Sequence, residues 1–310
     1  MPTTALLIPC YNAERYLPAL QRQIEAIHPK FDEVILVDDG STDRTVKKGR
    51  ELGLKIEPLG TNRGPGAARN AAAKRSKAEW IHFFDADDEI SPEYLSKVLP
   101  LATKETDVVL SSCDYVDEAS GILQMRWEYK EKPFRENPIR ATVAHQVVLH
   151  STLIRKSVFE KCKGFNEEMN CWEDADLHVR LACCGARFRV ISEVLARSPR
   201  HRRGASKSNL YCHQCRLEFL KEYAGLVPRL PAKDLTDQLI LTATRLFMEG
   251  DKQNCDKALD LALRHGWLGP ESNHLLMKAL SRIPSQKWRK TLFFMQMRAR
   301  GAHKKREFSY

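Results

Sequence analysis

The sequence predicts an α/β fold: a mostly parallel, Rossmann-like sheet flanked by helices, with a helical extension at the C-terminus. Three observations predict it. Short apolar runs alternate with helical patterns over the first hundred residues, polar clusters follow the apolar runs, and the pattern after Asn209 is helical nearly to the end. Alternation of this kind is typical of βαβ units, whose parallel sheet is covered on both faces.

The elements of the first hundred residues follow in regular order. Strands are expected at residues 5–8, 34–37, 54–56 and 80–84, and helices over 17–27, from about 43, and over 67–75. Ligands of parallel sheets bind beyond the carboxyl ends of the strands. The polar clusters at residues 9–14, 38–41 and 85–88 follow such strands, so we expect them to meet at one edge of the sheet.

Beyond residue 100 the pattern is less regular. Strands are expected over 107–113 and 147–154, a loop over 129–140, which contains Pro133 and Pro138, and a helix over 172–181. Residues 197–208 are polar, basic and rich in turn formers, which favours a mobile connection. We therefore divide the chain into a domain at 1–208 and a basic helical region at 209–310.

The composition excludes several classes of protein. With 43% hydrophobic and 29% charged residues, the chain resembles globular rather than disordered or fibrous proteins. No apolar run approaches the roughly 20 residues that cross a bilayer, and the N-terminal residues lack the basic region of a signal peptide. Nine cysteines without a disulfide-framework spacing indicate reduced thiols. We therefore expect a cytoplasmic protein.

The net charge of +10 is concentrated in the C-terminal third. Residues 197–310 carry 23 Lys and Arg against 10 Asp and Glu. This excess indicates either an anionic partner or only a soluble basic face. Residues 288–295 alternate basic and apolar groups. This pattern suits a helix lying on the anionic inner face of a membrane, or a packing helix whose aromatic face meets the domain at 1–208. Nucleic acid is not the expected partner, because it leaves the acidic clusters without a role.

Three carboxylates, Asp85, Asp87 and Asp88, follow the apolar strand at 80–84. Left bare, they would repel one another strongly. A hard divalent cation relieves this repulsion, and Mg²⁺ or Mn²⁺ is suited by one or two carboxylates plus diphosphate oxygens. Helix capping accounts for one of the three aspartates but not for all. The cluster therefore predicts a metal site.

Three further segments carry groups suited to a ligand, each with a plainer structural explanation. Residues 38–41 offer two carboxylates and a Gly-Ser turn, which also fit turn and cap chemistry. Residues 62–70 form a Gly-rich turn that opens a helix, where anions bind, and Arg69 adds fork-shaped donors. In residues 172–180, a Trp precedes Glu173 and Asp174. That order suits a base beside a stacking surface, or simply acidic residues at a helix start.

These segments, in this order, resemble the family 2 glycosyltransferases, an inverting group with the GT-A fold. The resemblance covers roughly residues 4–206. The matching stretches are Ile8–Asn12, Val37–Asp43, Asn62–Asn70, Asp85–Asp88, Gly164–Glu168 and Glu173–Leu177. Each motif is short, but six in register are difficult to produce by chance. Residues 209–310 match no motif of this family.

The resemblance implies a role for each matching side chain. Donor-binding residues would be Pro9, Tyr11, Glu14, Asp39, Gly40, Ser41, Asn62, Gly64, Arg69, Asp85, Ala86, Asp87 and Arg203. Asp87 would bind Mn²⁺ or Mg²⁺, and either His201 or the neighbouring arginines would act on the diphosphate, with His201 as the second candidate metal ligand. Asp174 would be the general base with Glu173 as its neighbour. Trp172 would form part of the acceptor floor.

The implied reaction moves a sugar from a nucleoside-diphosphate sugar to an acceptor hydroxyl, with inversion. UDP is the expected nucleotide, with guanine and thymine bases left open, and a glycan or lipid-linked acceptor would belong to surface polysaccharide or glycoconjugate synthesis. Two alternatives are a sugar-phosphate nucleotidyltransferase and a non-catalytic polyanion-binding module. The first needs a Gly-rich loop where this chain has residues 9–12. The second leaves the acidic clusters unexplained.

Overall fold

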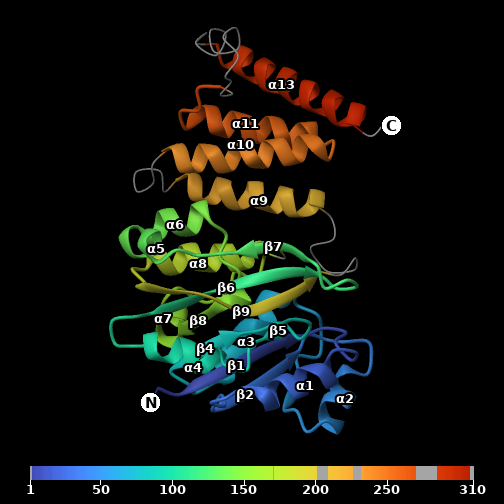
Figure 1. Cartoon of the computed structure of the whole chain (residues 1–310), viewed down its shortest axis with the longest axis vertical. Coiled ribbons are helices and arrows are strands. Elements are labelled where there is room, and N and C mark those ends of the chain that lie inside the picture. Colours follow the sequence, from blue (N-terminus) through green and yellow to red (C-terminus); the bar gives the residue numbers. More distant parts are fainter. Residues whose placement is uncertain (1, 170, 201–208, 226–231, 270–284, 308–310) are drawn as a thin grey trace. The chain divides into compact units, whose positions relative to one another are not determined.

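The computed structural model describes residues 2–169, 171–200, 209–225, 232–269 and 285–307 (Figure 1). The chain divides into two compact units, Met1–Lys207 and Ser208–Tyr310. The first unit contains the sheet, and the second is helical in its described part.

Within the described residues, the first unit is built on one nine-stranded sheet with the order β3-β2-β1-β4-β8-β6-β9-β5, and β7 pairs with β6. The strands are β1 (Thr4–Cys10), β2 (Glu33–Asp38), β3 (Ile56–Pro58), β4 (Trp80–Phe83), β5 (Glu89–Ile90), β6 (Val108–Asp117), β7 (Leu123–Trp127), β8 (Thr152–Arg155) and β9 (Phe188–Arg200). Strands β1 to β4, β6 and β9 run in one direction, and β5, β7 and β8 run in the other. The predicted α/β fold is confirmed, with three antiparallel strands added to a mostly parallel sheet.

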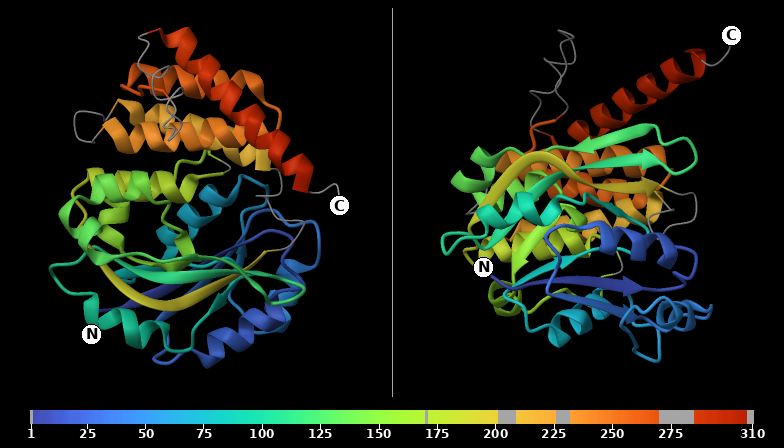
Figure 2. Two further views of the ribbon diagram at one scale, coloured as in Figure 1. Left: turned by 45° about the horizontal axis from the view of Figure 1, so that its top comes forward. Right: turned by 60° about the horizontal axis from the view of Figure 1, so that its bottom comes forward.

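Helices cover both faces of this sheet (Figures 1 and 2). They are α1 (Leu17–Ala26), α2 (Thr45–Glu51), α3 (Pro65–Arg75), α4 (Tyr94–Val98), α5 (Glu131–Glu136), α6 (Pro138–Ala144), α7 (Lys156–Lys161) and α8 (Glu173–Cys183). Helices α1, α2 and α4 pack on the face that receives Leu6 and Ile8, and α3 and α5 to α8 pack on the face of Ala5 and Leu7. Successive strand residues point to opposite faces. A strand buried on both sides therefore needs the continuous apolar run of β1.

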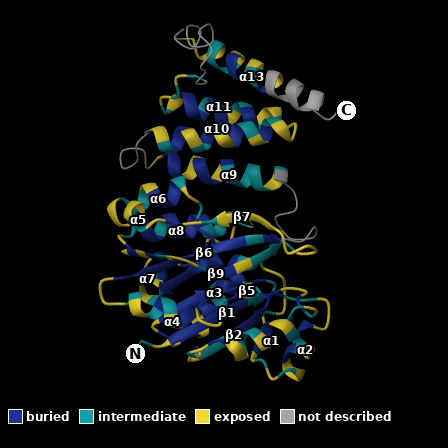
Figure 3. Cartoon of the chain, in the orientation of Figure 1, coloured by how far each residue is buried: buried dark blue, intermediate teal, exposed yellow. Residues whose placement is uncertain are grey.

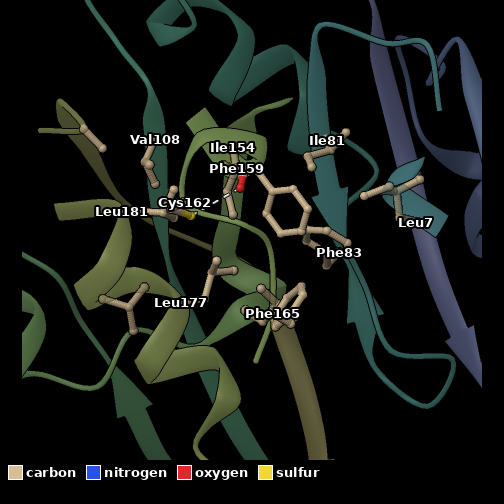
Figure 4. Packing of buried hydrophobic residues seen from close by; sticks show 14 of the residues in the cluster. Leu7, Ile81, Phe83, Val108, Ile154, Phe159, Cys162, Phe165, Leu177 and Leu181 are labelled. Carbon is tan, nitrogen blue, oxygen red and sulfur yellow. Dashed lines mark hydrogen bonds between the residues drawn. The ribbon is translucent and has the colours of Figure 1, made fainter. Parts of the chain in front are cut away.

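The apolar cluster on the face of Ala5 and Leu7 fixes the position of α8, the helix that carries the predicted base. Phe83 of β4 lies against Phe159 and Phe165, and the cluster extends to Leu177 and Leu181 of α8 (Figure 4). Strands β1, β4, β6 and β8 are buried along most of their length, β9 is buried only in part, and β7 is largely exposed (Figure 3). Because α8 is held along its buried face, its first turn has a defined place at the rim of the sheet.

The segment predicted as a loop at 129–140 instead contains α5 and α6. Pro133 and Pro138 both lie in the first turn of their helices, where a missing N–H costs no intrahelical hydrogen bond. The side chain of Asn137 caps α6 by accepting from the backbone N–H of Arg140 at 3.0 Å. The prolines therefore mark helix starts here, and the prediction of a loop was wrong.

Two other expectations beyond residue 100 need correction. The strand predicted at 147–154 is shorter, because Leu149–Ser151 form a 3₁₀ turn and β8 begins at Thr152. The connection predicted from Arg197 is strand as far as Arg200, because β9 continues its pairing with residues 114–117 of β6. The rest of that predicted connection, 201–208, lies outside the described residues.

The second unit contains α9 (Asn209–Ala224), α10 (Ala232–Met248), α11 (Lys252–Arg264) and α13 (Gln286–Glu307), which confirms the helical pattern. Phe293 and Phe294 of α13 contact Trp267 and Phe247, so its aromatic face packs within this unit. Lys290 pairs with two aspartates of α11 at 2.8 and 2.6 Å. In the ranges described above, no helix is both long and apolar enough to span a bilayer.

Candidate active site

Most of the predicted donor residues follow the carboxyl ends of β1, β2 and β4, which are adjacent parallel strands, whereas Asn62, Gly64 and Arg69 come after β3. Hydrogen bonds join the loops that leave them. Asn12 accepts from the backbone N–H of Thr42 at 2.9 Å, and its own N–H donates to Ser41 Oγ at 2.9 Å. Asn12 has a φ of 50°, a left-handed conformation that Asn tolerates better than most residues. The polar clusters at 9–14 and 38–41 therefore form one connected rim.

Tyr11 and Glu14 differ in how far they are available to a ligand. The Tyr11 side chain is 51% exposed, which leaves its ring open for stacking. Glu14 binds Arg44 through Nε at 2.9 Å, and this hydrogen bond lowers the pKa of Glu14 below its usual value. Pro9 lies in β1 opposite Val37, with part of its surface exposed. A base stacked on Tyr11 would thus lie beside the Glu14–Arg44 pair.

Asp39 is buried and holds the Gly-rich turn. Its two oxygens accept from the backbone N–H groups of Arg63 at 2.8 Å and Gly64 at 2.9 Å. Burial raises the pKa of Asp39, and these two bonds oppose that shift. Each carboxylate oxygen can accept a further hydrogen bond. Asp39 therefore shapes the turn and can still accept an N–H from a ligand.

Gly40 and Ser41 serve the close approach of two loops. Gly40 has a φ of 72°, and a Cβ at this position would lie 2.6 Å from the backbone N of Asn62. The hydroxyl of Ser41 bonds to Asp38, and its N–H donates to the same carboxylate at 3.1 Å. Asn62 accepts from the N–H of Gly64 at 3.2 Å. Only glycine fits at position 40 without moving the 61–64 turn.

Arg69 of α3 links the end of β4 to the start of α8. Its guanidinium donates to Asp85 Oδ1 and to Glu173 Oε1, both at 2.8 Å, and it lies 5.5 Å from the centre of the Phe165 ring. Burial alone would lower the pKa of Arg69, but Asp85 and Glu173 outweigh it and raise the pKa above its usual value. Since its side chain is only 6% exposed, this charge is a fixed part of the site.

Asp174 lies in the first turn of α8. Trp172, the residue just before this helix, has a left-handed φ of 69°. A bulky residue adopts that conformation only where the surrounding structure requires it. Asp174 accepts from the N–H of Ala175 at 2.8 Å and from Gln146 Nε2 at 3.4 Å. Burial, followed by the charge of Glu173, raises the pKa of Asp174 to about 7. A carboxylate with this pKa suits a general base near neutral pH.

The turn at 85–88 separates its acidic side chains. The Asp85 side chain is 40% exposed and Asp87 is partly exposed, whereas Ala86 and Asp88 are buried. Because the Ala86 side chain packs into the core, a donor contact at this position would come from its backbone. Burial, with Asp85 and Asp87, raises the pKa of Asp88 well above its usual value. Asp85 and Asp87 are the members of the turn available to a ligand.

These two aspartates fit a divalent cation only with help from a substrate. Within the described residues, no group of three or more His, Cys, Asp or Glu side chains is arranged to hold a metal. Mg²⁺ typically takes one or two carboxylates and completes its shell with water and phosphate oxygens. Asp85 and Asp87 supply hard oxygen donors of this kind.

Sequence reasoning missed two groups at this site. Arg15 lies within electrostatic reach of Asp87, and Gln146 reaches Asp174. Neither belongs to a motif, and Gln146 comes from a segment remote in sequence, so only the three-dimensional structure reveals them. The predicted residues His201 and Arg203 lie outside the described part of the chain.

Comparison with known proteins identifies the family of this chain. The model of glycosyl transferase family 2 matches residues 5–163, just over half of the chain. An uncharacterized glycosyltransferase of Haemophilus influenzae is 36% identical over 108 residues, 32% of this chain and 42% of that protein. The Staphylococcus aureus poly(ribitol-phosphate) beta-N-acetylglucosaminyltransferase TarS is 40% identical over 98 residues, 29% of this chain and 17% of TarS. Each match spans less than half of the relative.

Solved structures extend the likeness in fold to nearly the whole chain. S. aureus TarS in complex with UDP-GlcNAc aligns with a TM-score of 0.66 at 20% identity, covering 96% of this chain and 89% of that one. The mannosyltransferase PcManGT from Pyrobaculum calidifontis, in complex with GDP-Man and Mn²⁺, aligns with a TM-score of 0.58 at 16% identity, covering 96% and 84%. The family match, the GT-A-like fold and the order of the motifs agree: the chain belongs to glycosyl transferase family 2.

Proposed function

We propose that this protein is an inverting glycosyltransferase that moves a sugar from a UDP-sugar to an acceptor hydroxyl. The observation that carries the proposal is the buried Arg69, which holds Asp85 and Glu173 2.8 Å from its two terminal nitrogens. Asp85 belongs to the expected donor side, and Glu173 precedes the expected base. The bridge thus supports a single site in which donor and acceptor meet.

In the proposed mechanism, Asp174 takes the proton from the acceptor hydroxyl as its oxygen attacks the anomeric carbon from the side opposite the leaving group. One base and one displacement invert the configuration at that carbon. The pKa of about 7 makes Asp174 a stronger base than an ordinary aspartate, and about half of it is ionised at neutral pH. Gln146 and the Ala175 N–H orient its carboxylate.

Donor binding is assigned to the rim formed by the first two loops. Tyr11 would stack on the base, and the remaining lone pairs of Asp39 would accept its N–H. Asp87, with Asp85 nearby, would hold Mn²⁺ or Mg²⁺ against the diphosphate, and the cation would supply charge neutralisation for the departing nucleotide. Arg15 adds a positive charge within electrostatic reach of Asp87. His201 and Arg203, which lie outside the described residues, keep their predicted roles at the diphosphate.

The choice of donor nucleotide and acceptor rests on the similar proteins of known name. TarS is named for N-acetylglucosamine transfer to poly(ribitol phosphate) and has been solved with UDP-GlcNAc, whereas the Pyrobaculum enzyme has been solved with GDP-Man. The 40% sequence identity to TarS over 98 residues favours UDP for this chain. We propose a glycan or lipid-linked acceptor in polysaccharide synthesis on the cytoplasmic side of a membrane. The first unit would perform the transfer.

A panel of nucleotides measured by thermal shift tests the proposal. UDP should raise the melting temperature more than GDP or dTDP, and more strongly with Mn²⁺ than with EDTA. Asp87→Asn should remove the metal dependence, and Asp174→Asn should keep nucleotide binding but lose sugar transfer. Full transfer by Asp174→Asn would rule out the base, and an unchanged metal effect in Asp87→Asn would rule out the metal corner.

A further inference from the structure

Asp88 is the one acidic side chain of the 85–88 turn that the proposed reaction does not use. It is 5% exposed and turned into the protein. Its Oδ2 lies 3.3 Å from Nδ1 of His150, and Ser198 of β9 gives it a side-chain hydrogen bond. A buried polar group of this kind is costly unless it is paired. The partners of Asp88 come from two segments that follow it by more than sixty residues.

His150 connects Asp88 to a third segment. Its second ring nitrogen, Nε2, lies 2.8 Å from the Sγ of Cys113 in β6. Cys113, Val148 and Ala196 form a small buried apolar cluster, and the ring of Tyr115 lies 5.8 Å from that of His150. In each of the two polar contacts of His150, either partner can carry the hydrogen of the hydrogen bond. The series of contacts from Asp88 through His150 to Cys113 therefore does not depend on one protonation state.

The backbone of the same turn is held by a side chain of α1. Gln23 of α1 donates from Nε2 to the carbonyl oxygen of Asp88 at 3.1 Å and accepts from the N–H of Ile90 at 2.9 Å. The N–H of Asp88 also donates to the carbonyl of Asp85 at 3.1 Å, which closes the turn. A fixed Asp88 therefore fixes the residues before it.

We propose that Asp88, His150 and Cys113 form a buried anchor that orients the 85–88 turn, so that His150 is a positioning residue for donor binding. This inference rests on the proposed donor site. With Asp88 held inward by His150 and Ser198, the alternation of the turn directs Asp85 and Asp87 outward. Without the His150 contact, Asp88 keeps only the hydrogen bond from the Ser198 side chain. Its carboxylate can then turn toward solvent or the cation, and the turn no longer holds Asp85 and Asp87 in a fixed geometry.

Two substitutions at position 150 separate the contacts. In His150→Asn the amide group takes roughly the place of Nδ1 and keeps the contact with Asp88. In His150→Gln the amide reaches the place of Nε2 and keeps only the contact with Cys113. Both replace an imidazole with a neutral amide, so they are matched in charge. Supporting groups around a metal ligand typically contribute about 10-fold or more to metal affinity.

The measurement is the dissociation constant of UDP by calorimetry on the full-length protein, with Mn²⁺ and with EDTA, beside the melting temperature of the free protein. His150→Asn should bind UDP with Mn²⁺ within about threefold of wild type, and His150→Gln should bind about tenfold more weakly. With EDTA the two should be equal. Equal affinities of the two variants in the presence of Mn²⁺ would overturn the anchor.

Two further variants keep the result interpretable. If His150→Gln does not fold, Ser198→Ala removes the other side-chain donor to Asp88 and should weaken Mn²⁺-dependent UDP binding in the same direction. Wild-type affinity in Ser198→Ala would then overturn the proposal. Asp87→Asn tests the donor site itself. If it keeps the metal effect, the metal assignment fails, whereas the anchor is still decided by the affinity difference between the two His150 variants.

Discussion

The sharpest prediction concerns the pH dependence of transfer. Asp174 must be ionised to act as a base, and its pKa of about 7 is raised by burial and then by the charge of Glu173. The rate constant kcat/KM should therefore fall as pH drops through about 7. Glu173→Gln keeps the shape of the side chain and an oxygen that accepts from Arg69, but removes its negative charge. It should move this acid limb to lower pH.

The size of the shift follows from the position of Glu173. Carboxylates of neighbouring helical residues lie about 6–8 Å apart, and at an effective dielectric constant of about 20 they repel by about 2–3 kcal/mol. Arg69, which contacts Glu173 at 2.8 Å, cancels part of that repulsion. We expect a net shift of about one pH unit, which corresponds to about 1.4 kcal/mol.

Gln146→Leu provides a control of opposite sign. It removes the amide that donates to Asp174 at 3.4 Å, and this contact lowers the pKa of Asp174. The acid limb should then move upward, by about half a pH unit for so long a bond. The assay is UDP release from the donor at limiting acceptor between pH 5 and 9. An acid limb below pH 5 in wild type, or an upward shift in Glu173→Gln, would refute the reasoning.

Three other predictions test the site and its surroundings. Because folding raises the pKa of Asp174 above its usual value, its ionisation costs stability as pH rises from about 4 to 7. The shift of about three pKa units corresponds to about 4 kcal/mol, so Asp174→Asn should melt higher than wild type at pH 8, by about 10 °C, and equally at pH 4. Gly40→Ala should lower nucleotide affinity and melting temperature more than Gly53→Ala, since both have a left-handed φ but only the first would meet a neighbouring backbone; equal effects would contradict this. If the basic α13 binds anionic vesicles, reversing the exposed Lys287 and Arg298 to Glu should weaken co-sedimentation at least tenfold, and absence of wild-type binding would remove the membrane hypothesis.

The first half of the sheet was predictable because its signals are local. Continuous apolar runs such as Val34–Val37 identify buried parallel strands, and the polar turns that follow must then lie at one rim. The hydrogen bonds between Asn12 and residues 41–42 show that the first two of these turns do meet. The order of the motifs further predicted that Glu173 lies near this rim. The local sequence pattern was sufficient for each strand together with the turn that follows it.

The remainder depended on contacts between distant residues. Pro133 and Pro138 were interpreted as loop formers, although each lies in the first turn of a helix that packs its apolar side on the sheet. Strand β7 is exposed along its length and lacks the apolar run that marks a strand. Arg69 was expected to bind the donor, and its partners within the structure are two carboxylates, 16 and 104 residues away. A sequence motif gives the residue type at such a position and not the pairing.

The acidic turn that suggested a metal site shows why the pairing matters. Three aspartates within four residues would repel one another if all faced one ligand. In the structure each has a different neighbour: Asp85 binds Arg69, Asp87 lies within reach of the Arg15 charge, and Asp88 contacts His150. These neighbours offset part of the repulsion before a cation arrives, although Asp85 and Asp87 still raise the pKa of Asp88. The turn can therefore be held in a binding geometry without metal. Metal dependence of the reaction should therefore come from the donor diphosphate, and removing Mn²⁺ should weaken UDP binding without lowering the melting temperature of the free protein.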